Sequence, residues 1–175
     1  PELTVFYLGI NTRVAPFDDP RSRKAFAMAA NVTAIVKKEL FYAYPRAKGI
    51  MPIGLPGHNS ALESMPFDPV AAKALWDQVL EEKSLAPSEI KIKLATAGTI
   101  NKVLIEIAQA WSDNLGVEVS LLQIGSISDF TLEATNAQFF ETGWVAEFYI
   151  PWSQMAMPKA DGARRVGIYL SRQVA

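Results

Sequence analysis

The most constraining feature of the chain is a helical pattern that stands between two strand-like segments. Apolar residues recur at helical spacing over residues 100–115, and Gly116 follows as a typical C-terminal helix glycine. Residues 90–94 and 117–121, on either side, alternate apolar and polar side chains as half-buried strands do. A strand, a helix and a further strand in this order predict a crossover unit with parallel strands. We therefore expect an α/β protein.

The remaining segments extend this pattern over the whole chain. Residues 3–10 are rich in β-branched and aromatic residues and predict a buried strand, and a last strand is expected near residues 165–170. Asp19-Pro20 and Asp68-Pro69 each place a capping carboxylate before a proline, which predicts two helix starts. Asn31 is expected to cap a further short helix. We expect one α/β domain over residues 1–175, with a mixed, mostly parallel sheet flanked by helices.

Two of the predicted helices carry an apolar face that should be buried. The inward residues predicted for the helix after Asp68 are Ala71, Ala74, Leu75 and Val79. The core residues predicted for the helix before Gly116 are Val103, Leu104, Ile107 and Trp111.

Composition excludes several classes of function. Half of the residues are apolar, a fifth are charged and the net charge is −1, so no affinity for nucleic acid is expected. The chain has no cysteine, which excludes thiolate nucleophiles and thiolate metal sites. It begins without methionine and within a predicted strand, so we expect a fragment, a mature product or an excised domain.

Catalytic signatures are absent from the sequence. His58 is the single histidine, in a segment rich in glycine and proline (residues 44–59), and we expect an exposed or locally hydrogen-bonded loop residue. One histidine cannot supply a histidine-rich metal site. No carboxylate spacing favours a glycosidase pair, and no glycine loop for nucleotide phosphates precedes a helix. We expect no catalytic residue, no metal, no cofactor and no enzyme activity.

A cluster of charges surrounds the first helix start. Asp18 and Asp19 are best explained as capping residues. Arg21, Arg23 and Lys24 follow at the helix start, where the helix dipole disfavours cations. We expect these three side chains to form a solvated face rather than an anion site.

One carboxylate stands among aromatic residues near the end of the chain. Glu147 lies between Trp144 and Trp152, with Phe148 and Tyr149 directly after it. Such a set could hold an amine-bearing ligand by a charge-assisted hydrogen bond and a cation–π contact. The alternative, which composition alone favours, is a strand end with core aromatics.

An ordered series of segments resembles the second lobe of family 5 extracellular solute-binding proteins, the oligopeptide and dipeptide type that serves ABC importers. The matching segments are residues 7–12, 16–26, 29–31, 35–36, 49–52, 54–59, 67–69, 72–75, 115–119 and 143–147. The last of these, Gly143-Trp144-Val145-Ala146-Glu147 with Pro151 after it, is similar to the family's Gly-Trp-x-x-Asp-Tyr-x-x-Pro cleft motif. The sequence departs from the family at Asn31-Val32, where an Asp-Arg pair is common, and in a short tail after Trp152.

The resemblance implies both a fold and a function. The fold would be a periplasmic-binding-protein-like lobe, the second-lobe portion of a two-lobed protein whose first lobe is absent from this chain. The function would be the substrate-binding component of an ABC-type peptide or small-solute importer, with the ligand captured in the cleft between the lobes. The implied location is periplasmic or extracytoplasmic, with a lipid anchor on a missing N-terminus as an option. The implied partners are a peptide or other small solute, the transporter permease, and the missing first lobe or a partner subunit.

The resemblance also assigns binding residues. The implied ligand-binding residues are Gly143, Trp144, Glu147, Phe148, Tyr149 and Trp152. Glu147 would pair with the α-amine of the ligand, since peptide-binding members carry an acidic residue at that place. The alternative function is a stand-alone lobe acting as a structural or accessory subunit of a larger assembly, docked through an apolar patch over residues 144–157.

Overall fold

The computed structural model describes residues 4–40, 46–53, 55, 57–125, 136–148 and 168–170, with the side chains of residues 4, 144–148 and 168–170 left undescribed. In order, the elements are β1 (Thr4–Ile10), α1 (Pro20–Ala29), α2 (Val32–Glu39), α3 (Pro69–Glu82), a 3₁₀ turn η1 (Pro87–Glu89), β2 (Lys91–Thr96), α4 (Lys102–Leu115), β3 (Glu118–Gln123), β4 (Phe139–Phe148) and β5 (Ile168–Leu170).

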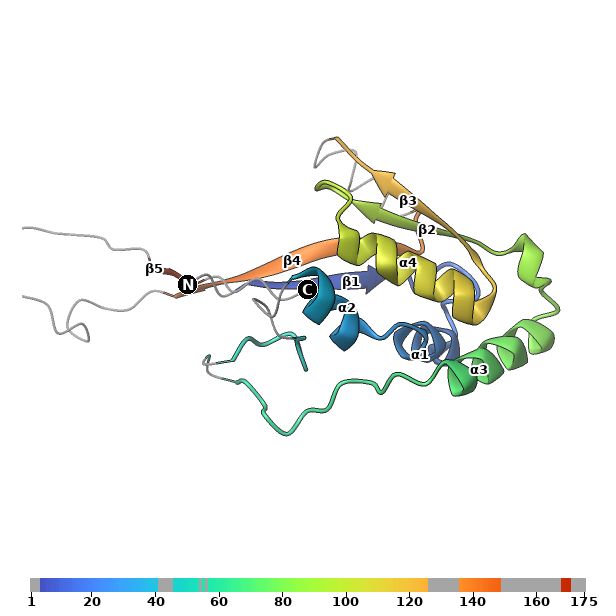
Figure 1. Cartoon of the computed structure of the whole chain (residues 1–175), viewed down its shortest axis with the longest axis horizontal. Helices are drawn as coiled ribbons and strands as arrows, with labels where there is room; N and C mark the ends of the chain where they lie inside the picture. Colours follow the sequence, from blue (N-terminus) through green and yellow to red (C-terminus); the bar gives the residue numbers. More distant parts are fainter. Residues whose placement is uncertain are drawn as a thin grey trace, which may run out of the picture.

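The strands form a mixed sheet in the order β1-β4-β2-β3, with β5 paired to β4. β2 runs parallel to β3 and to β4, whereas β1 and β5 each run antiparallel to β4. Helix α4 connects β2 to β3 and packs against β3 (Figure 1). The predicted parallel crossover and the mixed α/β class are therefore confirmed. Parallel and antiparallel pairings are equally represented among the described strands, because both β1 and β5 join β4 in the opposite direction.

Side-chain caps fix where the four α-helices begin. Asp19, Asn31, Asp68 and Asn101 each accept a hydrogen bond from a backbone N–H in the first turn of α1, α2, α3 and α4, respectively. The first three caps confirm the sequence predictions. Asn101 places the start of α4 slightly later than the apolar periodicity indicated. Gly116 ends α4 in the left-handed conformation, with φ of 72°, a backbone geometry that favours glycine.

The core lies between the sheet and the helices, and it confirms the predicted face of α4. Val103, Leu104, Ile107 and Trp111 are all buried. The predicted face of α3 is largely wrong. Of the predicted residues only Val79 is buried, whereas Ala74 is exposed and Ala71 and Leu75 are half-buried. The residues of α3 that are buried are Ala72, Trp76, Val79 and Leu80.

Tryptophan explains the orientation of α3. The indole of Trp76 is completely buried, with ring centroids 6.2 Å from Phe17 and 5.1 Å from Phe26. Burying this large ring gains more free energy than burying Leu75, so α3 turns the tryptophan inward. The aromatic cluster continues through Phe26 to Trp111 and Phe139, whose rings are 4.5 Å apart. The indole N–H of Trp111 donates to the backbone carbonyl of Phe26 at 2.9 Å.

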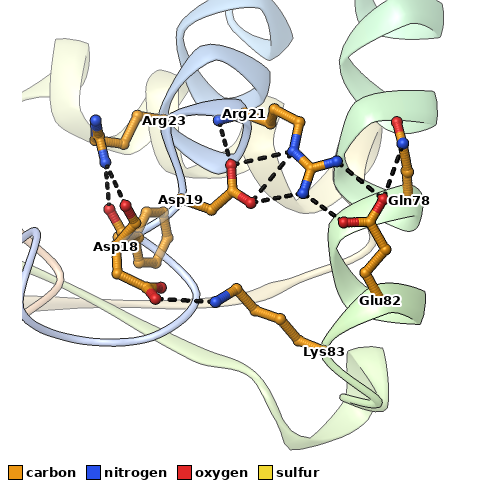
Figure 2. A network of polar contacts seen from close by, with 8 residues as sticks. Asp18, Asp19, Arg21, Arg23, Gln78, Glu82 and Lys83 are labelled. Carbon is orange, nitrogen blue, oxygen red and sulfur yellow. Dashed lines mark hydrogen bonds and ion pairs between the residues drawn. The ribbon is translucent and has the colours of Figure 1, made fainter.

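A polar network fastens the start of α1 to the end of α3 (Figure 2). The Arg21 guanidinium lies between two carboxylates, donating to Asp19 at 2.7 Å and to Glu82 at 3.0 Å. Lys83 donates to Asp18 at 2.9 Å. Hydrogen bonds from Arg21 lower the pKa of the Asp19 carboxyl from 3.8 to about 2. Arg21 also lowers the pKa of Glu82, chiefly through its hydrogen bond.

The same network corrects part of the predicted solvated face. Arg23 donates to the backbone carbonyls of Phe17 and Asp18, at 2.7 and 3.1 Å (Figure 2). Arg21 and Arg23 thus bind partners within the chain, while Lys24 is exposed as expected.

Candidate functional site

A cavity of about 800 Å³ opens beside β1 and β4. β1 lines one side, one face each of α1 and α4 and the two ends of α2 line the others, and residues 46–50 and 63–65 form the outer wall. These outer residues belong to the irregular segment between α2 and α3, which runs away from the sheet before α3 begins (Figure 1). The volume lies in the usual range of 300–1,000 Å³ for small-molecule sites.

Most of the cavity wall is apolar. Its inner surface includes rings and aliphatic chains that also belong to the core, so the cavity borders the packed interior directly. The inner apolar residues are Phe26, Val103, Leu104, Ile107, Trp111 and Phe139.

Glu141 is the carboxylate at the sheet end of this cavity. It lies on β4, opposite Leu8 of β1 on one side and Thr96 of β2 on the other. The Thr96 hydroxyl donates to Glu141 Oε2 at 2.6 Å, and the Asn101 amide donates to Oε1 at 3.4 Å. Thr96 ends β2 and Asn101 caps α4, so Glu141 is held at the carboxyl end of a parallel strand. Ligands of open α/β sheets commonly bind at this kind of position.

Sequence reasoning missed Glu141. Glu141 lies in a largely apolar stretch of the sequence, and the aromatic residues that mark Glu147 begin only after it. The signal that could have found it is the charge itself, because a carboxylate inside a run of strand-forming residues needs a polar partner or a site.

The outer wall of the cavity carries cations. Lys48 pairs with Glu63 at 3.1 Å. Arg46 donates to Thr33 Oγ1 at 3.4 Å, and within the described residues it has no carboxylate at ion-pair distance. Burial lowers the pKa of the Arg46 guanidinium, because desolvation disfavours its charged form.

The predicted binding residues follow Glu141 along and beyond β4. Gly143 is exposed and pairs with Phe6 of β1. Trp144, Glu147 and Phe148 continue the strand, and Glu147 pairs with Tyr169 of β5. The side chains of these three residues, and Tyr149 and Trp152 altogether, lie outside the described residues. The structure therefore gives a backbone position for four of the six predicted residues and leaves their proposed contacts untested.

The remaining candidates are the single histidine, a metal site and a membrane-spanning helix. His58 Nδ1 lies 2.9 Å from the Met51 carbonyl oxygen, so the predicted local hydrogen bond is confirmed. In the described part of the chain, no group of histidine and acidic residues could hold a metal ion. None of the described helices has the length and apolar character that crossing a bilayer requires.

Comparison with known proteins identifies the family. Residues 1–164 match the model for the middle region of bacterial extracellular solute-binding proteins, family 5. The chain belongs to this family. The identification agrees with the resemblance carried by the ordered segments of the sequence, and the relatives below are binding proteins.

Two curated relatives and one solved structure are similar to this chain over part of their own length. A di/tripeptide-binding protein of Pseudomonas aeruginosa is 32% identical over 135 residues, which is 70% of this chain and 25% of the relative. The dipeptide-binding protein of Escherichia coli is 35% identical over 86 residues, 49% of this chain and 16% of the relative. The Helicobacter pylori DppA structure, in complex with the peptide STSA, has a TM-score of 0.69 at 20% identity, covering 86% of this chain and 28% of that one.

The structural likeness at this identity shows the fold, which is that of a periplasmic binding protein. The chain spans about a quarter or less of the length of these two curated relatives.

Proposed function

We propose that this chain is the second-lobe portion of a protein that captures a peptide or similar small solute for an ABC importer outside the cytoplasm. Membership of family 5 supports this proposal, as does the identity to a di/tripeptide-binding protein. The observation that carries it is the cavity of about 800 Å³, with apolar walls and a few fixed polar groups, which is the usual composition of a small-molecule site.

Capture would require a second lobe. The cavity wall described here belongs to one lobe, and an open half-site buries too little of a ligand for tight binding. In this proposal residues 1–175 form one lobe, a first lobe from outside this sequence closes over the ligand, and the closed protein docks on the transporter permease. The location would be periplasmic or otherwise extracytoplasmic, with a lipid anchor on a preceding segment as one form of attachment.

The proposed binding surface comprises Gly143, Trp144, Glu147, Phe148, Tyr149 and Trp152. Glu147 would bind the ligand's α-amine and the aromatic residues would enclose its apolar groups. Glutamate keeps the charge of the family's aspartate but lengthens the side chain. We propose binding rather than catalysis as the activity of this surface, with no cofactor.

The proposal is tested by calorimetry on the complete protein with defined dipeptides and tripeptides. Removing the charge in Glu147→Gln should weaken binding by about 1.5–3 kcal/mol, the usual contribution of a charged hydrogen bond. Glu118→Gln is the matched control, because Glu118 is an exposed carboxylate of β3 whose contact with Lys91 is long, at 3.7 Å. Equal affinities of the parent and the Glu147 variant would remove Glu147 from the site.

The second candidate is a lobe that acts as a structural or accessory subunit. Exposed apolar side chains on the segment between α2 and α3, among them Ile50, Ile53 and Phe67, favour docking against another protein surface. In this case Trp152→Ala should loosen a complex while Glu147→Gln changes little. Native mass of the complete protein and of any assembly separates the two candidates.

A further inference from the structure

We propose that Glu141 contacts the bound solute and selects one that carries an ammonium or guanidinium group on an apolar body. This inference rests on the proposed function and adds a second acidic residue to it. Glu141 lies within the cavity wall, and its side chain is described by the structure, unlike that of Glu147.

The carboxylate of Glu141 is held in a fixed orientation. Thr96, which is only 1% exposed, donates to Oε2 at 2.6 Å, and its hydroxyl oxygen accepts the backbone N–H of Gly98 at 3.0 Å. Asn101 donates to Oε1 at 3.4 Å while its own side-chain oxygen caps α4 through the N–H of Leu104. The two donors are thus themselves anchored, one in β2 and one at the start of α4. A carboxylate fixed in this way is pre-organised for a ligand.

The same carboxylate has unused capacity for hydrogen bonds. Its two oxygens can accept about four in all, and Thr96 and Asn101 supply two. Within the described residues, no lysine, arginine or histidine lies at ion-pair distance from Glu141. A half-buried carboxylate that has hydrogen-bond donors but no cationic partner can form an ion pair with a cationic group of a ligand.

At the sheet end of the cavity, away from Arg46 and Lys48 on the outer wall, the surroundings of Glu141 favour a cation with an apolar body over an anion. The start of α4, where a free anion would otherwise bind, is already occupied by the Asn101 cap and the adjacent Glu141 carboxylate. An anionic ligand group would be repelled there. Beyond the carboxylate the wall becomes apolar at Val103 and Leu104, which suits an aliphatic or aromatic ligand body.

Glu141 would bind a different group of the ligand from the one that Glu147 binds. The two residues are six positions apart on one strand, β4, which separates their backbones by about 20 Å. One ligand amine cannot bind both carboxylates over this distance. Glu141 therefore contributes a separate element of specificity, such as recognition of a basic side chain.

The experiment uses the complete protein and calorimetry with matched peptides. Leu-Leu-Leu derivatives carry lysine at the first, second or third position, each paired with the peptide that has norleucine there, which lacks the ammonium group. Hexylammonium and hexanol form a further pair without any peptide bond. At one position at least, the parent should prefer lysine by roughly 10- to 100-fold, and Glu141→Gln should abolish that preference. Glu118→Gln, which removes an exposed carboxylate from the same sheet, should retain it.

The outcomes separate this inference from the proposed function. Peptides that bind with no lysine preference, or with a preference that Glu141→Gln retains, overturn the role of Glu141 and leave peptide capture standing. Hexylammonium bound through Glu141 without any peptide binding supports Glu141 and contradicts peptide capture. No preference in either the peptide or the hexyl pair overturns the inference. Thermal unfolding of each variant verifies the fold.

Discussion

The two ends of the helix-covered side of the sheet are built differently. At the α1–α3 end, Phe17, Phe26 and Trp76 interlock with almost no exposed surface, and the Arg21 network covers the outside. At the β1–α2 end, the same layer opens into a cavity of about 800 Å³ whose outer wall is an irregular segment. One end is filled by the side chains of this chain, and the other leaves room for a different molecule.

The difference separates stability from binding. Close-packed aromatic rings contribute burial and dispersion energy that holds the lobe together. A cavity contributes little to folding, and it keeps apolar surface available for a ligand. Phe26, Trp111 and Phe139 belong to both regions, since they are part of the core and also line the cavity. Substitutions at the packed end should therefore affect stability alone, whereas substitutions in the cavity wall should also change ligand affinity.

The largest effect is expected on the packed side. Trp76→Ala should destabilise the fold by about 3–5 kcal/mol, because it removes a completely buried ring between Phe17 and Phe26. Trp76→Phe is the control: it keeps an aromatic ring and removes an indole N–H that has no partner among the described residues, so a loss below about 1.5 kcal/mol is expected. Chemical denaturation measures both. A Trp76→Ala variant as stable as the parent would show that this side is not tightly packed.

A matched pair of leucines compares the two sides directly. Leu80 and Leu104 are 3% and 2% exposed, but only Leu104 lines the cavity. Both alanine variants should lose between about 2 and 5 kcal/mol, with Leu80 nearer the upper value, because Leu104 has fewer packing partners on its cavity side. Leu104→Ala alone should also change ligand affinity in the complete protein. Equal losses of stability, together with equal affinities, would contradict the distinction between the two sides.

The smallest effect is expected from the Arg21 network. The pKa of Asp19 is lowered from 3.8 to about 2, so its favourable interaction is fully present above pH 4 and is lost as the pH falls towards 2. Asp19→Asn keeps the helix cap but not the charge, and should lower the melting temperature by less than about 2 °C at pH 7. Melting curves of both proteins should converge as the pH approaches 2. A difference that persists at that pH would mean that the charge is not its cause.

The cap residues and the apolar periodicity of α4 could be predicted because they depend on neighbours close in the sequence. Asp19, Asn31 and Asp68 bond to backbone N–H groups two or three residues away. The orientation of α3 could not be obtained in this way. Two overlapping apolar sets were compatible with its periodicity, and contact with Phe17 and Phe26 selected the set that contains Trp76.

The α/β class, the starts of α1, α2 and α3, the parallel crossover and the family could all be inferred from the sequence, since local capping, periodicity and ordered motifs carry that information. Only the tertiary structure decided which residues surround the cavity. Arg46, Asn101 and Glu141 are far apart in the sequence, and no local pattern joins them. They line one space because β4 inserts between β1 and β2, which brings Glu141 beside Thr96 and the start of α4. Contacts of this kind depend on strand order, and strand order is settled by packing of the whole sheet.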